Sequence, residues 1–223
     1  MANTLTANII TLFPEMFDCL SYGVTGRAIR EKKLLIRCFN LRDYSNRKNK
    51  QVDDRPYGGQ CGMVLQYEPL KRATEDILSQ SSQTDIPVIL TCPKGELWQQ
   101  QAIEQFVSHQ EIIIVCGRYQ GIDQRYIDRY VTQTWSIGNY VLTGGELAGM
   151  VILDSVTRSM SGVLGNSESY DLGTHQSSEK EPPLYTRPYC VDGEKVPDAL
   201  MSGDPKQIEQ WKNETARKPS SEA

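Results

Sequence analysis

Short apolar runs alternate with helical patterns through the middle of the chain. Strands are predicted at 88–91, 112–116 and 131–137, and helices at 96–107 and 123–130. Continuous apolar strands separated by helices are typical of a parallel sheet that is covered on both faces. The pattern therefore predicts the α/β class, with a parallel sheet covered by helices.

The chain before this alternation predicts a similar mixture of strands and helices. Proline is tolerated in the first turn of a helix, so a short helix is expected from Pro14. We also expect strands at 4–13, 34–41 and 63–66, and helices at 23–33 and 69–79. The polar, glycine-rich run 43–62 is too long and too poor in apolar residues for a regular element, and loops of this length are usually functional or disordered.

Residues 135–160 join a turn rich in glycine to a long apolar helix. Gly138, Gly144 and Gly145 allow backbone amides and carbonyls to approach a ligand closely, because glycine has no side chain. The composition of the following helix is too apolar for a surface position. We therefore expect a binding site at this turn.

Two charged residues interrupt this apolar helix. Asp154 and Arg158 are four residues apart, so they lie on one side of the helix. A charge among apolar side chains needs a partner or a functional role. Either the two residues form an intrahelical ion pair, worth about 0.3–0.5 kcal/mol, or at least one of them serves a ligand.

Three of the predicted strands end in small or polar residues. These ends are 91–93, 117–119 and 136–138. In open α/β sheets, ligands bind beyond the carboxyl ends of the strands. We therefore expect the three strand ends to line one crevice.

The last quarter of the chain differs in character from the rest. After Met160 the sequence is polar and poor in apolar residues until about Pro183, which is typical of a linker or a mobile lid. The tail predicts a helix at 205–212 and disorder beyond Asn213. The expected organisation is a main domain at 1–160, a mobile linker at 161–182 and a short, mostly helical C-terminal domain at 183–223.

The composition is that of an ordinary soluble protein. The 223 residues are 39% hydrophobic, which is enough for a buried core. No stretch approaches the roughly 18–20 apolar residues of a membrane span, and the N-terminus lacks the features of a signal peptide. We therefore expect a cytoplasmic location and no membrane partner. The six cysteines form no C-x-x-C pair, so we expect neither a disulfide framework nor a metal site.

Charge is distributed unevenly along the sequence. The net charge is −4, yet residues 27–55 contain ten Lys/Arg and four acids, a local excess of +6, and the remaining residues together carry −10. Such asymmetry is typical of a protein that meets a polyanion on one face. The alternative is a solvated charged loop that has no partner.

Fingerprints of several enzyme classes are missing. G-x-G-x-x-G and G-x-x-x-x-G-K-[ST] do not occur, which argues against NAD-dependent oxidoreductases and P-loop hydrolases. The two histidines, His109 and His175, are not accompanied by a G-x-S-x-G motif, which argues against serine and cysteine hydrolases.

The loop 52–63, VDDRPYGGQCGM, combines acids, an arginine and a tyrosine with three glycines. A guanidinium and an aromatic ring on permissive backbone are suited to stacking on an extruded base and to contacting phosphate. The alternative is a well-ordered glycine-rich turn.

Several long motifs follow one another from about residue 5 to residue 212. They are ITLFPEMF at 10–17, YGVTGRAI at 22–29, VDDRPYGG at 52–59, VCGRYQGID at 115–123, WSIGNYVLTGGELAGM at 135–150, DSVTR at 154–158, GVLGN at 162–166 and YTRP at 185–188. In this order they closely resemble the bacterial tRNA (guanine-N1)-methyltransferases of the TrmD type. Their number and length make the resemblance specific.

The resemblance implies an S-adenosylmethionine-dependent enzyme of the SPOUT class. Such an enzyme has a deep trefoil knot in its cofactor-binding domain and is a homodimer with active sites between its subunits. The cofactor pocket implied by the motifs comprises Leu90, Thr91, Cys92, Pro93, Gly117, Tyr119, Gln120, Ser136, Ile137, Gly138, Asn139, Tyr140, Val141, Leu142, Gly144 and Gly145. This set agrees with the three strand ends.

The implied reaction transfers a methyl group to N1 of guanosine-37 of tRNA, next to the anticodon, in a G36-G37 context. N1 carries a proton that a general base must remove, and charge that develops on O6 needs a cation or hydrogen-bond donors. Arg158 matches the family's arginine for that electrostatic role. The family's base is an aspartate after GVLGN; Gly173 stands at that position here, so Asp171 is the expected base and Glu168 the fallback.

The tRNA is the expected macromolecular partner, besides a second copy of the chain. The residues expected to contact it are Arg47, Lys48, Lys50, Asp54, Arg55 and Tyr57. Assistance by Mg²⁺ is left open. The alternative function is a tRNA-binding paralogue with weak or lost methyl transfer, since removing a general base typically lowers the rate by about 10²–10⁴.

Overall fold

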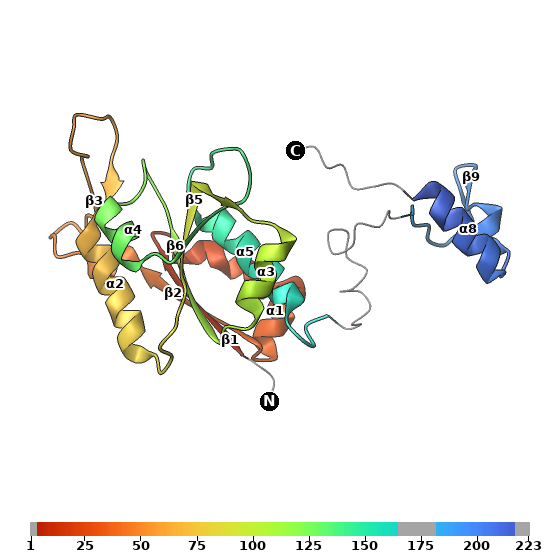
Figure 1. The fold of residues 1–223 in the computed structure, drawn as a ribbon, viewed down its shortest axis with the longest axis horizontal. Helices are drawn as coiled ribbons and strands as arrows, with labels where there is room; N and C mark the ends of the chain where they lie inside the picture. The colour runs from red at the N-terminus through yellow and green to blue at the C-terminus, as the bar shows by residue number, and fades with distance from the viewer. Residues whose placement is uncertain (1–3, 165–181, 217–223) are drawn as a thin grey trace. The chain divides into compact units, whose positions relative to one another are not determined.

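The computed structural model describes residues 4–164 and 182–216, which belong to two compact units. Unit 1 is Met1–Gly165 and unit 2 is Asn166–Ala223 (Figure 1). Among the helices that the structure describes, none is long and apolar enough to cross a membrane.

Unit 1 is built on one five-stranded sheet. Its strands are β1 (Leu5–Thr11), β2 (Leu34–Asn40), β5 (Val88–Leu97), β6 (Glu111–Cys116) and β7 (Gln133–Ser136). Their order across the sheet is β2-β1-β6-β5-β7, and every neighbouring pair is parallel. The predicted parallel α/β sheet is therefore confirmed.

Helices cover both faces of this sheet, as the apolar strands predict (Figure 1). One face carries the 3-10 helix η1 (Pro14–Ser21), α1 (Gly23–Arg30), α3 (Gln100–Val107) and α5 (Glu146–Ser159). The other face carries the 3-10 helix η2 (Leu41–Tyr44), α2 (Tyr67–Gln80) and α4 (Gln124–Tyr130). Successive strand residues point to opposite faces, so Ile9 and Ile10 of β1 belong to different cores.

Strand β5 is longer than its sequence predicts. The turn predicted at 93–95 is instead an irregularity within the strand, after which Glu96 and Leu97 pair with Trp135 and Ser136 of β7. The Trp98 N–H also donates to the Ser136 carbonyl oxygen at 2.7 Å. Consequently the helix predicted at 96–107 begins only at Gln100, because the preceding residues satisfy their backbone groups in the sheet.

Three shorter segments also differ from the prediction. The helix that begins at Pro14 is a 3-10 helix, and β7 covers only four residues of the predicted strand 131–137. The run 43–62 contains β3 (Asp53–Asp54), which pairs antiparallel with β4 (Val64–Leu65). A two-residue strand of acids has no apolar alternation, so the sequence pattern could not reveal it.

Unit 2 contains two short strands and two helices in its described part, 182–216. These elements are β8 (Cys190–Val191), β9 (Glu194–Lys195), α7 (Asp198–Met201) and α8 (Pro205–Thr215). Tyr185 packs edge-on against Trp211 with ring centroids 6.0 Å apart, but no residue of 182–216 is buried. The predicted helix is thus confirmed, and the predicted disorder directly beyond Asn213 is wrong because α8 continues to Thr215.

Candidate functional site

The carboxyl ends of β5 and β6 meet the turn that precedes α5. The Gly145 N–H donates to the Gly117 carbonyl oxygen at 2.8 Å, and Thr91 Oγ1 lies 3.3 Å from the Val115 carbonyl oxygen to which it donates. A Cβ atom on Gly145 would overlap Thr91 Oγ1 and lie 2.7 Å from the Gly117 nitrogen. Glycine is therefore required where these segments cross, and the structure brings the first two predicted strand ends together.

The third strand end, after β7, continues into a loop at 137–144. Ser136 Oγ donates to the Gly138 carbonyl oxygen at 2.9 Å, and the Tyr140 hydroxyl donates to the Ile137 carbonyl oxygen at 3.2 Å. Within residues 4–164 and 182–216, the backbone of 137–144 forms no hydrogen bond with other backbone. The Ile137, Gly138 and Thr143 carbonyl oxygens and the Gly138 N–H are bonded to side chains, so the other backbone donors and acceptors of this loop are available to a ligand.

The remaining residues of the predicted cofactor pocket differ in exposure. Leu90 and Thr91 are buried, while Cys92, Ile137, Gly138, Leu142 and Gly144 are half-buried and Pro93, Tyr119, Asn139, Tyr140 and Val141 are exposed. Tyr119 has a positive φ of 59° and so marks a sharp turn at the end of β6. The Gln120 N–H donates to the Met63 carbonyl oxygen at 2.9 Å, which connects this end to the glycine-rich loop 58–62.

A buried ion pair beside the crossing was not predicted from the sequence. Glu146, the first residue of α5, has no exposed surface, and its Oε2 accepts a hydrogen bond from Arg118 Nε at 2.8 Å. Its other carboxylate oxygen accepts from Thr11 Oγ1 at 3.0 Å. The only sequence signal is the placement of an acid in the first turn of a helix, where the helix dipole favours negative charge.

Arg118 joins three segments through this pair. Its guanidinium lies 4.5 Å from the centre of the Phe13 ring, and its Nη1 donates to the Thr143 carbonyl oxygen at 3.2 Å. A Cβ atom on Gly144 would overlap this guanidinium. The pair therefore fixes the turn 143–145 relative to the ends of β1 and β6.

Helix α5 is not buried all round, so the prediction drawn from its apolar composition is wrong. Leu147 and Val151 are 48% and 45% exposed, and Asp154 and Arg158 lie on the same exposed side. Only the opposite stripe of the helix packs into the core, as is usual for a helix that covers a sheet. Asp154 has a partner from α1, because its Oδ1 accepts from Thr25 Oγ1 at 2.7 Å.

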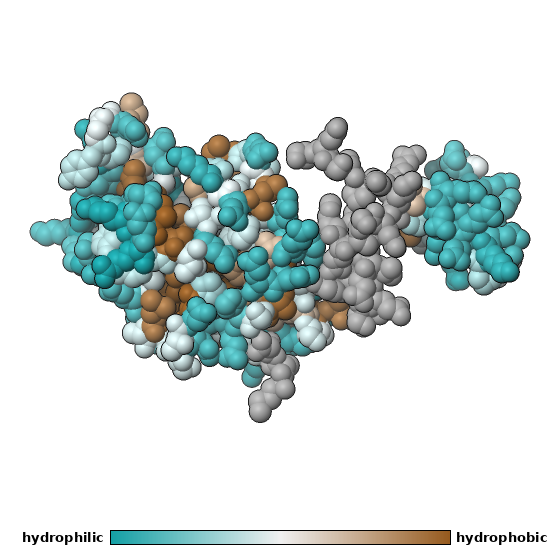
Figure 2. All heavy atoms as spheres, in the orientation of Figure 1, coloured by the Kyte–Doolittle hydropathy of each residue, from teal (hydrophilic) through white to brown (hydrophobic). Residues whose placement is uncertain are grey.

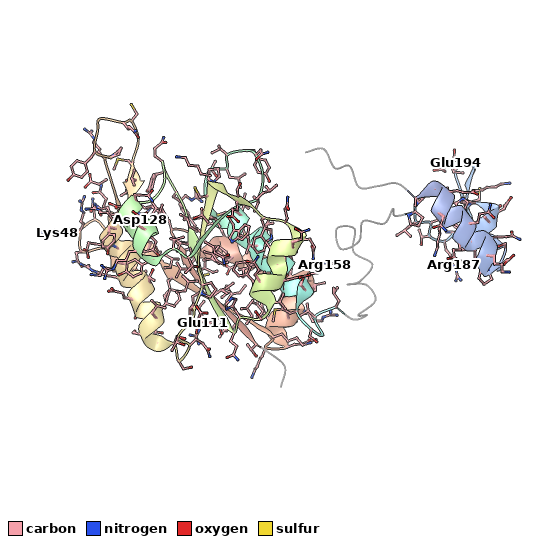
Figure 3. The ribbon with its side chains drawn as sticks, viewed as in Figure 1. Lys48, Glu111, Asp128, Arg158, Arg187 and Glu194 are labelled. Atoms are coloured by element: carbon pink, nitrogen blue, oxygen red, sulfur yellow. The ribbon has the colours of Figure 1, made fainter. Side chains whose placement is uncertain are left out.

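Arg158 lies at the far end of α5 from the crossing. An α-helix rises 1.5 Å per residue, so about 20 Å of helix separates Gly145 from Arg158. Figure 3 shows Arg158 and Lys48 on opposite sides of unit 1. One chain therefore does not place its own Arg158 beside its own glycine-lined crossing. The predicted base Asp171, its fallback Glu168 and Gly173 lie outside the described residues.

The predicted tRNA-binding residues lie in the segment between η2 and β4, where Asp54 belongs to β3 and the others to its flanking loops. Arg47 Nη2 and Asp54 Oδ2 form an ion pair at 2.7 Å, and Lys50 Nζ lies 2.8 Å from Asp43 Oδ1. The Arg47 guanidinium holds the pKa of the Asp54 carboxyl below its usual range. Tyr57 is 99% exposed, and Lys48 projects outward beside α2 (Figure 3).

No group of three or more His, Cys, Asp or Glu side chains gathers around a possible metal position in the described part of the chain. The strand ends instead offer backbone groups, two half-buried apolar side chains at Ile137 and Leu142, and the Tyr140 ring. This set suits a ligand with an aromatic base and hydroxyl groups more than a metal ion.

Fold and site together define an α/β protein with glycine-lined strand ends that meet beside α5, and with a basic loop on its surface. Residues 5–222 match the family model described as tRNA (Guanine-1)-methyltransferase TrmD. The chain belongs to this family.

Relatives and a solved structure agree with the family model. The chain is 44% identical over 205 residues to the tRNA (guanine-N(1)-)-methyltransferase of Actinobacillus succinogenes, covering 92% of this chain and 83% of that protein. It is 43% identical over 209 residues to the protein of the same name from Pasteurella multocida, covering 93% and 85%. The crystal structure of tRNA (m1G37) methyltransferase from Aquifex aeolicus is similar with a TM-score of 0.79 and 35% identity, covering 94% of this chain and 88% of that one.

Proposed function

We propose that the protein methylates N1 of guanosine-37 in tRNA, in a G36-G37 context, with S-adenosylmethionine as the methyl donor. The observation that carries this proposal is the glycine-lined crossing of Thr91, Gly117 and Gly145 in a member of the TrmD family. The SPOUT-type trefoil knot is part of the same proposal, because the segments that meet at this crossing follow one another along the chain in the same order as the family's motifs.

The residues at the strand ends fit the proposed donor. Backbone groups of 137–144 that have neither a backbone nor a side-chain partner in the described residues can hydrogen-bond an adenine and a ribose, and Tyr140 and Leu142 offer apolar contact. When bound there, S-adenosylmethionine supplies an activated methyl group on its sulfonium. The described residues form no group of three or more protein ligands for a metal ion, so any Mg²⁺ that assists would be held largely by phosphate oxygens and water.

The chemistry that this chain must supply concerns the guanine. Asp171, in the segment between the two described parts, takes the N1 proton, so that the N1 lone pair can form a bond to the methyl carbon while the bond from that carbon to the sulfonium sulfur breaks and its electrons remain on the sulfur. Arg158 stabilises the negative charge that builds on O6. Because about 20 Å of helix separates Arg158 from its own crossing, Arg158 of a second copy serves each site, and the working form is a homodimer.

The tRNA is held by the basic surface of unit 1 and by unit 2. The local excess of +6 in residues 27–55 attracts phosphate. Lys48 projects from the loop beside α2 (Figure 3), and Arg47 and Lys50 lie on the same loop in exposed ion pairs with Asp54 and Asp43. Asp54, Arg55 and Tyr57 lie on the adjoining loop, where the anticodon loop is expected to bind.

Incubation of the full-length protein with S-adenosylmethionine and an unmodified tRNA transcript tests this function. After digestion, mass spectrometry of the nucleosides should reveal N1-methylguanosine from a transcript with G36-G37, and none from a matched transcript with adenosine at position 37. Cofactor and tRNA binding without this nucleoside would instead favour a tRNA-binding paralogue.

A further inference from the structure

The chain leaves α5 through a short segment, 160–163, that is fixed to unit 1. Met160 and Val163 are buried in the core that α1 and α5 cover. The Val163 N–H donates to the Met160 carbonyl oxygen at 3.2 Å, and Gly162 between them has a positive φ of 73°. The segment is therefore a defined turn, which we call the exit turn.

Two cations from α1 and the residues after it hold the carbonyl oxygens of the exit turn. Lys33 Nζ donates to the Gly162 carbonyl oxygen at 2.6 Å, and Arg27 Nη2 donates to the Val163 carbonyl oxygen. The Glu31 carboxylate contacts both cations, with Oε2 at 2.7 Å from Lys33 Nζ and Oε1 at 3.9 Å from Arg27 Nε. We call Arg27, Glu31 and Lys33 the α1 clamp.

The end of α1 places Lys33 for this contact. Lys32 has a positive φ of 58°, and its N–H donates to the Ile29 carbonyl oxygen at 3.0 Å. The next N–H, that of Lys33, donates to the Ala28 carbonyl oxygen at 2.9 Å. These two bonds form the Schellman pattern that ends many helices. The approach of Lys33 to the turn is close, because a Cβ atom on Gly162 would lie 3.3 Å from Lys33 Nζ.

Helix α1 also contacts α5 one turn before Arg158. Thr25 is buried, and its Oγ1 donates to Asp154 Oδ1 at 2.7 Å. Figure 3 shows Arg158 at the same end of unit 1 as α1. Thr25 and the α1 clamp thus attach the chain to α1 on both sides of Arg158 along the sequence.

The exit turn is the starting point of the segment that carries Asp171. Eight residues lead from Val163 to Asp171, and an extended chain spans at most about 3.6 Å per residue, so Asp171 stays within about 29 Å of the turn. A general base acts only within hydrogen-bond reach of the proton that it removes. A displacement of about 1 Å can lower a rate by about 10², so the direction in which the chain leaves the turn matters.

We propose that Arg27 and Lys33 are positioning residues for methyl transfer. By holding the carbonyl oxygens of residues 162 and 163, they set the direction in which the chain leaves unit 1 toward the base Asp171. This proposal rests on the proposed function, because it assigns the α1 clamp to the same reaction. Buried Val163 already anchors the turn in the core, so the clamp acts on the orientation of the exit and not on folding.

The test compares the double variant R27Q/K33Q with R30Q/K32Q. Arg30 and Lys32 are matched controls, because both are exposed cations at the same end of α1 and Arg30 donates to the Ser21 carbonyl oxygen at 3.3 Å. Each double variant loses two positive charges, so general attraction of tRNA should fall equally in both. Figure 2 shows that the visible face of unit 1 is mostly hydrophilic, so glutamine in place of an exposed cation preserves the character of the surface.

Single-turnover methyl transfer at saturating S-adenosylmethionine separates positioning from binding. R27Q/K33Q should transfer the methyl group about 10-fold more slowly than the wild type, which is less than the roughly 10²–10⁴ expected for complete loss of a general base. R30Q/K32Q should react like the wild type. Thermal melting and the dissociation constants for S-adenosylmethionine and tRNA should be the same in the two double variants. K33R, which keeps a cationic donor, should retain most of the rate that K33Q loses.

The pH dependence identifies the step that the α1 clamp affects. A displaced base leaves the N1 proton to water, so the deficit of R27Q/K33Q should shrink as rising pH ionises N1 unaided. A displaced Arg158 would instead lower the rate by the same factor throughout. A deficit that stays constant from about pH 7 to about pH 9, or equal rates in the two double variants, would overturn the proposal.

Hydrogen exchange provides a readout that requires no turnover. The Val163 amide should exchange about 10-fold faster in R27Q/K33Q than in the wild type, because release of the two carbonyl oxygens lets the exit turn open more often. R30Q/K32Q should not change this exchange. An exchange rate unaltered in R27Q/K33Q would refute the α1 clamp. A wild type with a protected exit turn that forms no N1-methylguanosine would refute the proposed function alone.

Discussion

Glu146 illustrates how a single buried carboxylate can organise a site without touching a substrate. It receives hydrogen bonds from Thr11 and Arg118, so its two oxygens connect the ends of β1 and β6 to the start of α5. A buried charge is tolerated only when it is paired in this way. The pair therefore holds the glycine turn 143–145 in place, at the site proposed for the cofactor.

Replacing this carboxylate should destabilise the protein strongly. Glu146→Ala leaves Arg118, whose side chain is 18% exposed, without its main partner, and breaking a buried pair typically costs about 3–5 kcal/mol. Urea unfolding measures the loss. Glu104→Ala, on the exposed side of α3, is the control and should stay within about 0.5 kcal/mol of the wild type. Equal losses in the two variants would contradict the assigned role of the pair.

The cysteines should differ in reactivity for reasons of burial. Burial raises the pKa of the Cys38 thiol to about 11 and holds the pKa of the fully enclosed Cys116 thiol well above its ordinary value. Because the thiolate is the reactive form, both should remain unlabelled by iodoacetamide at pH 8, while exposed Cys19, Cys61 and Cys190 react. Raising the pH toward 11 should bring Cys38 into reaction. Mass-spectrometric mapping follows each site, and urea-unfolded protein, in which all sites should react, is the reference.

At the scale of elements, the crossing depends on where α5 begins. Gly145→Ala would force a Cβ atom against Thr91 and Gly117 and should abolish cofactor binding in calorimetry. Gly149→Ala is the matched control within α5, because its Cβ would meet Ile114 and Cys116 at ordinary contact distances of 3.4 and 3.5 Å. Alanine also favours a helix interior, so this control should bind the cofactor normally. Unchanged binding by both variants would exclude the crossing from the cofactor site.

The sequence predicts the centre of this sheet well because β1, β6 and the first half of β5 are buried on both faces. Runs such as 112–116 contain no polar residues, so the sequence marks them clearly as buried strands. Their connection by helices implies parallel pairing. Prediction fails where backbone pairing overrides local signals. Pro93 and Gly95 indicate a turn, yet the chain resumes pairing with β7 and delays α3 to Gln100. The glycines of the site were recognisable, whereas the Arg118–Glu146 pair joins residues 28 apart and has no local signature.

At the scale of the whole molecule, the basic loop should govern how tRNA affinity responds to salt. Neutralising Arg47, Lys48 and Lys50 to Gln should weaken tRNA binding and flatten its dependence on salt, because each phosphate contact releases bound counterions. Filter binding across a range of KCl concentrations gives the slope. S-adenosylmethionine affinity, which should not change, serves as the internal control. A slope equal to that of the wild type would remove this loop from the tRNA surface.

The length of α5 has a consequence for mixtures of defective proteins. Suppose that each site combines the glycine-lined crossing of one chain with the Arg158 guanidinium of the other chain. The Arg158→Ala and Gly145→Ala variants are then each inactive alone, because the first removes the guanidinium and the second disrupts the crossing. When equal amounts of the two variants are refolded together, half of the dimers contain one chain of each variant. In such a dimer one site carries both substitutions and the other site carries neither. The mixture of the two inactive variants should therefore recover roughly a quarter of the wild-type turnover. If no activity is recovered, each chain works alone.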